Sequence, residues 1–113
     1  MKRKPKTPKK IDHYSLISEG GFQDSVIELA HWYGWRVAHF HKIKMNGKWF
    51  TPVAADGEGF PDLVLARAGK VLFVEMKSEA GTLSPPQREW AASLRTLRIW
   101  RPRDMDLIEA ELR

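Results

Sequence analysis

The chain has 113 residues, enough for one domain with a single core but too few for two independent domains. The apolar content of 42%, with five Trp and five Phe, indicates a folded core, and no apolar run reaches the length of a transmembrane helix. Without cysteine the chain forms no disulfide or thiolate metal site, and without a secretory signal pattern it is expected to be a soluble intracellular protein.

The formal net charge of +5 is concentrated near the N-terminus. Without the six cations of residues 1–10, the chain has 13 cations and 14 anions, so the remainder is close to neutral. We predict a basic, disordered tail and lead-in over residues 1–17 and a single domain over residues 18–113. The tail can attract phosphate backbones through counterion release without sequence preference, and a merely solubilising tail is the alternative.

The first half of the chain contains three recognisable patterns. Apolar residues at helical spacing over residues 22–33, followed by a glycine, predict a first helix. Alternation over residues 35–41 predicts a strand. Asn46-Gly47, in the middle of residues 43–50, predicts a small hairpin outside the core.

The second half is predicted to contain the centre of the sheet. Apolar strands over residues 61–66 and 71–76 are joined by residues 67–70, which are few enough for an antiparallel hairpin. Ser84, followed by two prolines and then Gln87, predicts the start of a second helix.

The predicted second helix carries an apolar stripe at Trp90, Ala91, Leu94 and Leu97. A short strand over residues 98–101 and a last helix from about residue 103 follow. We interpret Trp90 and Trp100 as core or dimer contacts, because their neighbours have apolar periodicity. This order of elements predicts a compact α/β domain.

The residues most indicative of chemistry lie on the predicted strand pair. Glu75 and Lys77 are two apart on a strand and therefore project from the same face. Antiparallel pairing across a short turn brings Asp62, near the start of one strand, beside the end of the next. We therefore expect Asp62, Glu75 and Lys77 to meet at one edge of the sheet.

Two carboxylates and a free backbone carbonyl suit a hard divalent cation such as Mg²⁺ or Mn²⁺. Such a cation polarises a phosphodiester and lowers the pKa of bound water, while Lys77 would orient that water or offset charge on phosphorus. For an arbitrary D…ExK spacing, a surface ion pair is the usual interpretation. The Gly-Phe-Pro-Asp segment ending at Asp62 and the hairpin context favour a functional site instead.

Glu19 is the third candidate carboxylate for this site. At 100° per residue it lies over the apolar stripe of the first helix, so it is expected to face the sheet. A carboxylate in that position needs a partner, and a metal or Lys77 could supply one. The alternative is that Glu19 only stabilises the start of the helix.

The hairpin around Asn46-Gly47 combines cations with aromatic rings. Lysines suit phosphates and rings suit unpaired bases, as in a junction or a flap, whereas an ordinary hairpin with Trp49 packed inward is the alternative. The residues predicted to contact nucleic acid are Lys42, Lys44, Lys48 and Arg88.

Two other groups of polar residues are each open to two interpretations. His39 and His41 lack further ligands at suitable spacing, so contact with phosphate or solvent is favoured over a metal site. Five arginines are interpreted as a DNA-facing strip, with an ordinary solvated face as the alternative. They are Arg88, Arg95, Arg98, Arg101 and Arg103.

Taken together, these segments resemble the VRR-NUC family, the stand-alone viral-type nucleases of the PD-(D/E)XK superfamily. The resemblance extends from about Ser18 to Asp106. Its segments are a Glu before a helix that ends in Gly-Trp, Gly-Phe-Pro-Asp-Leu, Phe-Val-Glu-Met-Lys-Ser, and Gly-Thr-Leu-Ser-Pro-Pro-Gln-Arg-Glu-Trp. By this resemblance the catalytic and metal-binding residues are Glu19, Asp62, Glu75, Lys77 and the backbone carbonyl of Met76, with Gln87 bordering the site.

The resemblance implies a restriction-endonuclease-like fold, with a mixed central sheet flanked by helices. It also implies a Mg²⁺- or Mn²⁺-dependent endonuclease, a homodimer that cuts branched DNA such as Holliday junctions, and a role in DNA repair. The expected location is the cytoplasm of a prokaryote or of a virus's host. Two alternatives are a non-catalytic DNA-binding or scaffold subunit, and a duplex-cutting, restriction-like nuclease.

Overall fold

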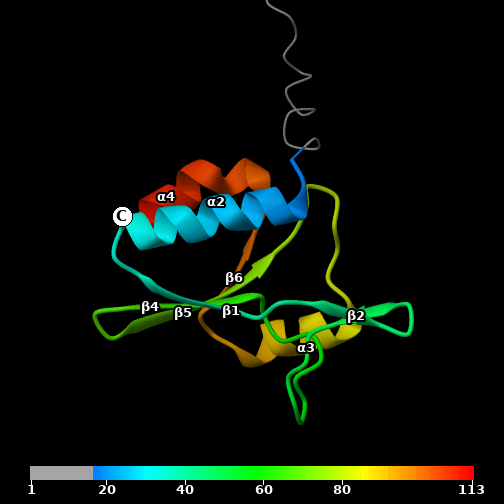
Figure 1. Ribbon diagram of the computed structural model, residues 1–113. Coiled ribbons are helices and arrows are strands. Elements are labelled where there is room, and N and C mark those ends of the chain that lie inside the picture. Colours follow the sequence, from blue (N-terminus) through cyan, green and yellow to red (C-terminus); the bar gives the residue numbers. More distant parts are fainter. Residues whose placement is uncertain (1–16) are drawn as a thin grey trace, which may run out of the picture.

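The computed structural model describes residues 17–113, and the predicted tail before Ile17 lies outside the described residues. The described part has three layers (Figure 1). Helices α2 (Glu19–Trp32) and α4 (Met105–Leu112) cover one face of a four-stranded sheet, and α3 (Pro85–Ser93) covers the other. No helix within these residues is long and apolar enough to cross a membrane.

Helix α2 begins and ends at the predicted signals. The hydroxyl of Ser18 accepts a hydrogen bond from the Gly21 N–H at 3.0 Å, which satisfies one of the free N–H groups at the helix start. The buried residues of α2 are Phe22, Val26 and Ala30, as the helical spacing predicted. Gly34 follows with a φ of 85°, a conformation that glycine adopts at no steric cost.

The main sheet has the order β1-β4-β5-β6, from strands β1 (Arg36–His39), β4 (Leu63–Arg67), β5 (Lys70–Met76) and β6 (Leu97–Trp100). Strand β4 is antiparallel to β1 and β5, whereas β5 and β6 are parallel. The sheet is therefore mixed, and its central strands are the predicted pair. They are joined by Ala68 and Gly69, both with positive φ, so the turn is even tighter than the four residues predicted.

A second, two-stranded sheet stands apart from the first. It consists of β2 (Ile43–Met45) and β3 (Lys48–Phe50), joined by Asn46 and Gly47 with φ values of 53° and 78°. The predicted hairpin is confirmed, and all residues of both strands are exposed. Trp49 is 65% exposed, so the alternative in which its ring packs inward is wrong.

Helix α3 is shorter than predicted. Its start has the expected capping box between Ser84 and Gln87, but the helix ends at Ser93. Leu94 is already extended, and Leu97 is the first residue of β6, where it is paired with Phe73. The prediction that the helical stripe continues to Leu97 is wrong, because pairing with β5 determines the conformation here.

The core lies between the sheet and the helices α2 and α4. Alternate residues of β5, at Leu72, Val74 and Met76, are buried on this face together with Ile108 and Leu112 of α4. Trp100 is also buried in this core, as predicted. The opposite face of β5 carries Phe73 and Glu75 toward α3, and the candidate site is on that side.

Candidate active site

Asp62 is held in place by the strands on either side of it. Its backbone carbonyl accepts a hydrogen bond from the Phe40 N–H at 3.0 Å, which extends the pairing of β1 and β4. Its side-chain Oδ2 accepts a second bond from the Met76 N–H at 2.8 Å. The carboxylate is only 5% exposed, so it points from the start of β4 across to the end of β5.

The residue before Asp62 explains why the end of β5 is open to a ligand. Continuing the β4–β5 register by two residues places Pro61 opposite Met76. Proline has no N–H, so it cannot donate the ladder hydrogen bond that the Met76 carbonyl would otherwise accept. The Pro-Asp pair therefore supplies a carboxylate to the Met76 N–H and leaves the Met76 carbonyl free of that partner.

Glu75 occupies the same edge on the α3 side of the sheet. It is 3% exposed, and its Oε2 accepts a hydrogen bond from Gln87 Nε2 at 3.0 Å. Lys77 Nζ lies 4.0 Å from the same oxygen. The expectation that Asp62, Glu75 and Lys77 meet at one edge is thus confirmed, and Gln87 joins them.

Gln87 connects the helix start to the site. Its Oε1 accepts a hydrogen bond from the Ser84 N–H at 2.8 Å and closes the capping box, while its Nε2 donates to Glu75. The two prolines before it fix the first turn of α3. Local helix capping therefore determines the orientation of a carboxylate on the sheet.

The two carboxylates compete for ionisation. Burial, followed by the charge of Asp62, raises the pKa of Glu75 from its ordinary value of 4.5 to about 8, although Lys77 and Lys42 act in the opposite direction. At neutral pH the metal-free site therefore retains a proton on Glu75. A divalent cation could replace that proton, and the donor set of two buried carboxylates and a carbonyl has the hard oxygen chemistry that such a cation needs.

Glu19 is not brought into this cluster. It is half-buried at the first position of α2, and residues 17–113 contain no group of three His, Cys, Asp or Glu side chains close enough to hold a metal. The helical spacing gave its direction around the helix axis but not its distance from the sheet edge. Its proposed role as a metal ligand stays a prediction.

The rings of the two histidines near the site lie against each other at a tilt of 43°. The rings of His39 and His41 are 4.1 Å apart between centroids. Burial and the neighbouring His41 lower the pKa of His39, against the opposing effect of Asp62 and Asp24. The predicted contact of His39 and His41 with phosphate or solvent stays a prediction.

Most of the arginines assigned to a DNA-facing strip bind other parts of the protein. Arg98 pairs with Glu111 at 2.8 Å, and Arg103 pairs with Glu79 at 2.6 Å. Arg101 donates to backbone carbonyls in the loop after Lys77. These partners account for the three side chains within the fold, whereas Arg88 is exposed and donates one bond to the Leu83 carbonyl. The DNA-facing strip stays a prediction.

Sequence reasoning missed the structural part played by Arg101. Its Nη1 donates to the carbonyls of Ser78 and Gly81 at 2.7 and 2.6 Å, which fixes the loop that follows Lys77. The Lys77 N–H also donates to the Trp100 carbonyl at 2.9 Å. No motif marks such an arginine, because its partners are backbone carbonyls of another segment.

Sequence reasoning also missed how Trp90 supports the site. Its indole N–H donates to the carbonyls of Asp56 and Glu58 at 3.1 and 3.2 Å, and its ring contacts Phe60 edge to face. Gly59 lies in the same loop, with a φ of 80°, where a Cβ would come within 2.6 Å of Pro86. The glycine before Phe60 was the available signal that this loop packs tightly on α3.

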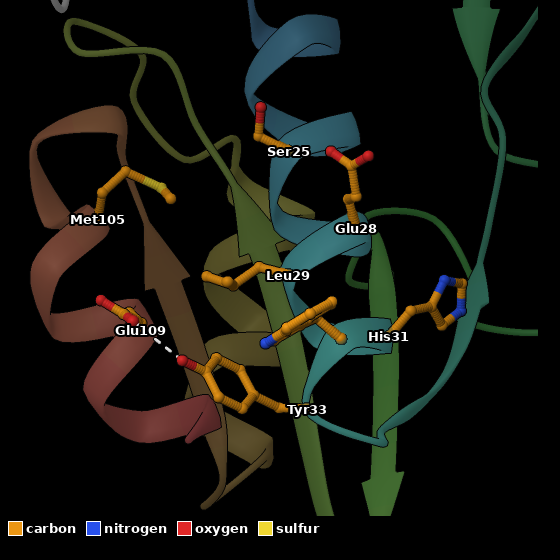
Figure 2. A pocket seen from close by; sticks show the side chains of 8 residues that line it. Ser25, Glu28, Leu29, His31, Tyr33, Met105 and Glu109 are labelled. Carbon is orange, nitrogen blue, oxygen red and sulfur yellow. Dashed lines mark hydrogen bonds between the residues drawn. The ribbon is translucent and has the colours of Figure 1, made fainter.

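Two surface hollows of similar size lie on opposite sides of the sheet. One, of about 710 Å³, lies between α2 and α4, where Leu29, Tyr33 and Met105 face one another and Tyr33 donates to Glu109 at 2.9 Å (Figure 2). The other, of about 730 Å³, is lined by Asp62 and Gln87 and by residues of the β2–β3 hairpin. Only the second of these two contains a carboxylate of the buried pair.

Comparison with known proteins adds a family match. The model of the VRR-NUC domain family matches residues 41–100, which are more than half of the chain. The matched residues include the β2–β3 hairpin, both strands of the carboxylate pair, α3 and β6, whereas Glu19 lies before them. No curated protein and no solved structure matches the chain.

Proposed function

The chain belongs to the VRR-NUC family of nucleases with a PD-(D/E)XK-like fold, and on this premise we propose that it is a metal-dependent endonuclease that hydrolyses DNA. The observation that carries the proposal is the buried pair of Asp62 and Glu75 at the sheet edge, with Lys77 at 4.0 Å from Glu75. Buried like charges are unfavourable without a cation, so their presence together favours a metal site.

The chain supplies distinct groups for the reaction. Asp62, Glu75 and the Met76 carbonyl would hold Mg²⁺ or Mn²⁺. When bound, such a cation polarises the phosphodiester and lowers the pKa of a bound water. The Lys77 ammonium group would donate a hydrogen bond to the attacking water or to a phosphate oxygen. Gln87 keeps the Glu75 carboxylate oriented through its 3.0 Å hydrogen bond.

The preferred substrate in this proposal is branched DNA, such as a Holliday junction, processed during DNA repair. The exposed hairpin, with lysines beside Trp49 and Phe50, supports contact with phosphates and unpaired bases. A homodimer is part of the proposal, because two sites related by a twofold axis can reach opposing strands of a symmetric junction. A duplex-cutting nuclease is less favoured, since a chain of 113 residues leaves little surface for the dedicated groove-reading element that sequence-specific cutting needs.

The deciding experiment compares the parent with Lys77→Ala on four-way junction, flap, single-stranded and linear duplex DNA, each with Mg²⁺, Mn²⁺ or EDTA. We expect metal-dependent cutting of the branched substrates that is lost in the variant. Lys70→Ala is the matched control, since Lys70 is an exposed residue at the other end of the same strand. Glu19→Gln, assayed for metal affinity, tests whether Glu19 is a further ligand.

Three other results would each contradict one part of this proposal. Cutting by Lys77→Ala at the parent's rate, with contaminating nuclease excluded, would show that the site assignment is wrong. Binding of junctions without any cutting by the parent would favour the non-catalytic scaffold. Equal cutting of linear duplex and junction would favour the restriction-like alternative.

A further inference from the structure

The groove of about 730 Å³ beside Asp62 has a shape and lining that the two carboxylates alone do not explain. It extends from Asp62 and Gln87 at the sheet edge to Trp49 and Phe50 on β3. Its volume lies within the range of about 300–1,000 Å³ that is usual for sites that hold a small molecule. A groove of this size accommodates a single unstacked nucleotide but not a base-paired helix.

One wall of the groove is aromatic and exposed. Trp49 and Phe50 are 65% and 40% exposed, although large rings normally contribute to stability by burial. The Lys44 ammonium lies 5.6 Å from the Trp49 ring centroid, which places a cation beside the ring. Exposed rings beside cations are the combination with which proteins stack and hold single-stranded nucleic acid.

Another part of the lining is fixed by close packing. Gly59 lies against Pro86 so closely that no side chain would fit between them. The Trp90 N–H bonds to two carbonyls of the loop that precedes Gly59. Pro85 and Pro86, which also line the groove, form the rigid first turn of α3. A base that enters the groove would therefore have both an exposed ring of the hairpin and a preformed surface to contact.

The charges in the groove agree with a nucleotide. Lys42 lines it together with Asp62, so a cation lies in the same groove as one carboxylate of the buried pair. Glu58 also lines the groove and can accept hydrogen bonds from a base. The phosphate end of a nucleotide is thus attracted toward the sheet edge, and the base is directed toward β3.

From these features we propose that the groove binds one unpaired nucleotide of the strand that is cut, with its base stacked on Trp49 and its phosphate beside Lys42. This inference rests on the proposed nuclease function and specifies its substrate: the DNA must offer an unstacked nucleotide next to the scissile phosphate. Flaps and opened junctions provide such a nucleotide, whereas an intact linear duplex does not.

The first test measures binding without cleavage. A fluorescein-labelled thymidine tetranucleotide and its abasic counterpart are titrated into the full chain in EDTA and followed by anisotropy. We expect the parent to prefer the base-bearing probe by about tenfold, the effect of one base–aromatic stack. Trp49→Ala should lose this preference, and Trp49→Phe should recover part of it. Trp32→Ala is the control, because Trp32 is 81% exposed on α2, on the other side of the sheet.

The second test measures cleavage of a flap whose nucleotide next to the cut is either thymidine or abasic. Trp49→Ala and the abasic substitution should each slow the parent's cutting by about tenfold, and together by no more than either alone. If Trp49→Ala equals Trp32→Ala in both tests, the inference is overturned. A loss of dimer mass in Trp49→Ala with unchanged probe binding would also overturn it, since the rings would then contact a second copy.

The nuclease function and the nucleotide site are tested by different results. A parent that cuts no DNA but prefers the base-bearing probe through Trp49 supports the nucleotide site and contradicts the nuclease function. A parent that cuts branched DNA with no dependence on Trp49 supports the nuclease function and contradicts the nucleotide site.

Discussion

Two regions of the molecule meet at one groove and differ in nearly every physical property. The sheet edge with Asp62 and Glu75 is buried between strands, whereas all residues of the β2–β3 hairpin are exposed and the hairpin projects beyond the sheet (Figure 1). In residues 17–113 every buried side-chain nitrogen or oxygen has a hydrogen-bond partner. The side chains at the edge are thus held in fixed positions, whereas the hairpin presents a surface that is available for contact.

In the proposed function, this difference assigns the chemistry to the sheet edge and the recognition of the substrate to the hairpin. Reacting groups must be held within a fraction of an ångström, which buried central strands and a helix cap achieve. Rings that stack on a flexible substrate must instead be reachable from solvent. Each region is unfavourable by itself, one through like charges and the other through exposed rings, and each is expected to be stabilised by its own ligand.

The largest expected effect of any substitution is at the edge. Asp62→Asn keeps an oxygen that can accept from the Met76 N–H but removes the charge. We expect cleavage to slow by about 10²–10³-fold, as for the loss of one electrostatic contact in a preorganised site. The melting temperature in EDTA should be unchanged or higher, because without the charge of Asp62 the Glu75 carboxyl can ionise at a lower cost. Single-turnover rates and thermal melts test this, with Asp56→Asn as the control, and an undiminished rate would contradict it.

The next effect is a dependence of the free energy of unfolding on pH, which should come from Glu75 at the sheet edge and not from the hairpin. The folded metal-free protein holds a proton on Glu75 up to about pH 8, whereas the unfolded chain releases it near 4.5. The free energy of unfolding should therefore fall as pH rises between these values, by on the order of 2 kcal/mol after relaxation of the ionised site, and level off above pH 8. Denaturant titrations in EDTA of the parent and Glu75→Gln measure it. Parallel pH profiles for the two proteins would refute the prediction.

A smaller effect is expected from the cations of the hairpin. Lys44→Ala with Lys48→Ala should weaken binding of flap DNA by about tenfold at low salt and reduce the slope of log affinity against log salt by about two, because two phosphates lose their partners. The melting temperature should stay the same, since both side chains are exposed. Lys70→Ala with Arg36→Ala removes the same charge at exposed positions of β5 and β1 and is the control. An unchanged slope of log affinity against log salt would show that these lysines do not contact DNA phosphates.

The smallest effect concerns the residue that joins helix and edge. Gln87→Ala removes both the acceptor for the Ser84 N–H and the donor to Glu75, and should cost about 1 kcal/mol of stability. Gln87→Glu keeps the capping acceptor but not the donor, so it should restore the helix start while leaving cleavage slower than in the parent. Stability and rate that recover together would show that Gln87 acts on the helix alone.

Most of the fold could be predicted because its signals are local. Asn46-Gly47 predicted the exposed hairpin, and Ser84 with Gln87 predicted the start of α3, since each is a short-range hydrogen-bonding or turn preference. The meeting of Asp62 with Glu75 was predictable for the same reason, because a tight turn between two strands fixes their register.

Features that depend on distant partners could not be predicted. Leu97 continues a helical pattern in sequence but belongs to a strand, because β5 pairs with it. Arg101 looks like a surface cation, and only the fold shows that it binds the carbonyls of Ser78 and Gly81. The distance of Glu19 from the sheet edge also depends on how α2 packs on the sheet. Helical periodicity does not predict this packing.

The two-residue turn at Ala68 and Gly69 has a consequence for the order of folding. A hairpin closes in about 1–10 μs, whereas the parallel pairing of β5 with β6 must wait for the longer segment that contains α3. Asp62 and Glu75 therefore come together early, while water still separates their charges. Their repulsion grows only when the later elements exclude that water. The energetic cost of the site thus arises in the last step of folding, after the chain topology has been decided.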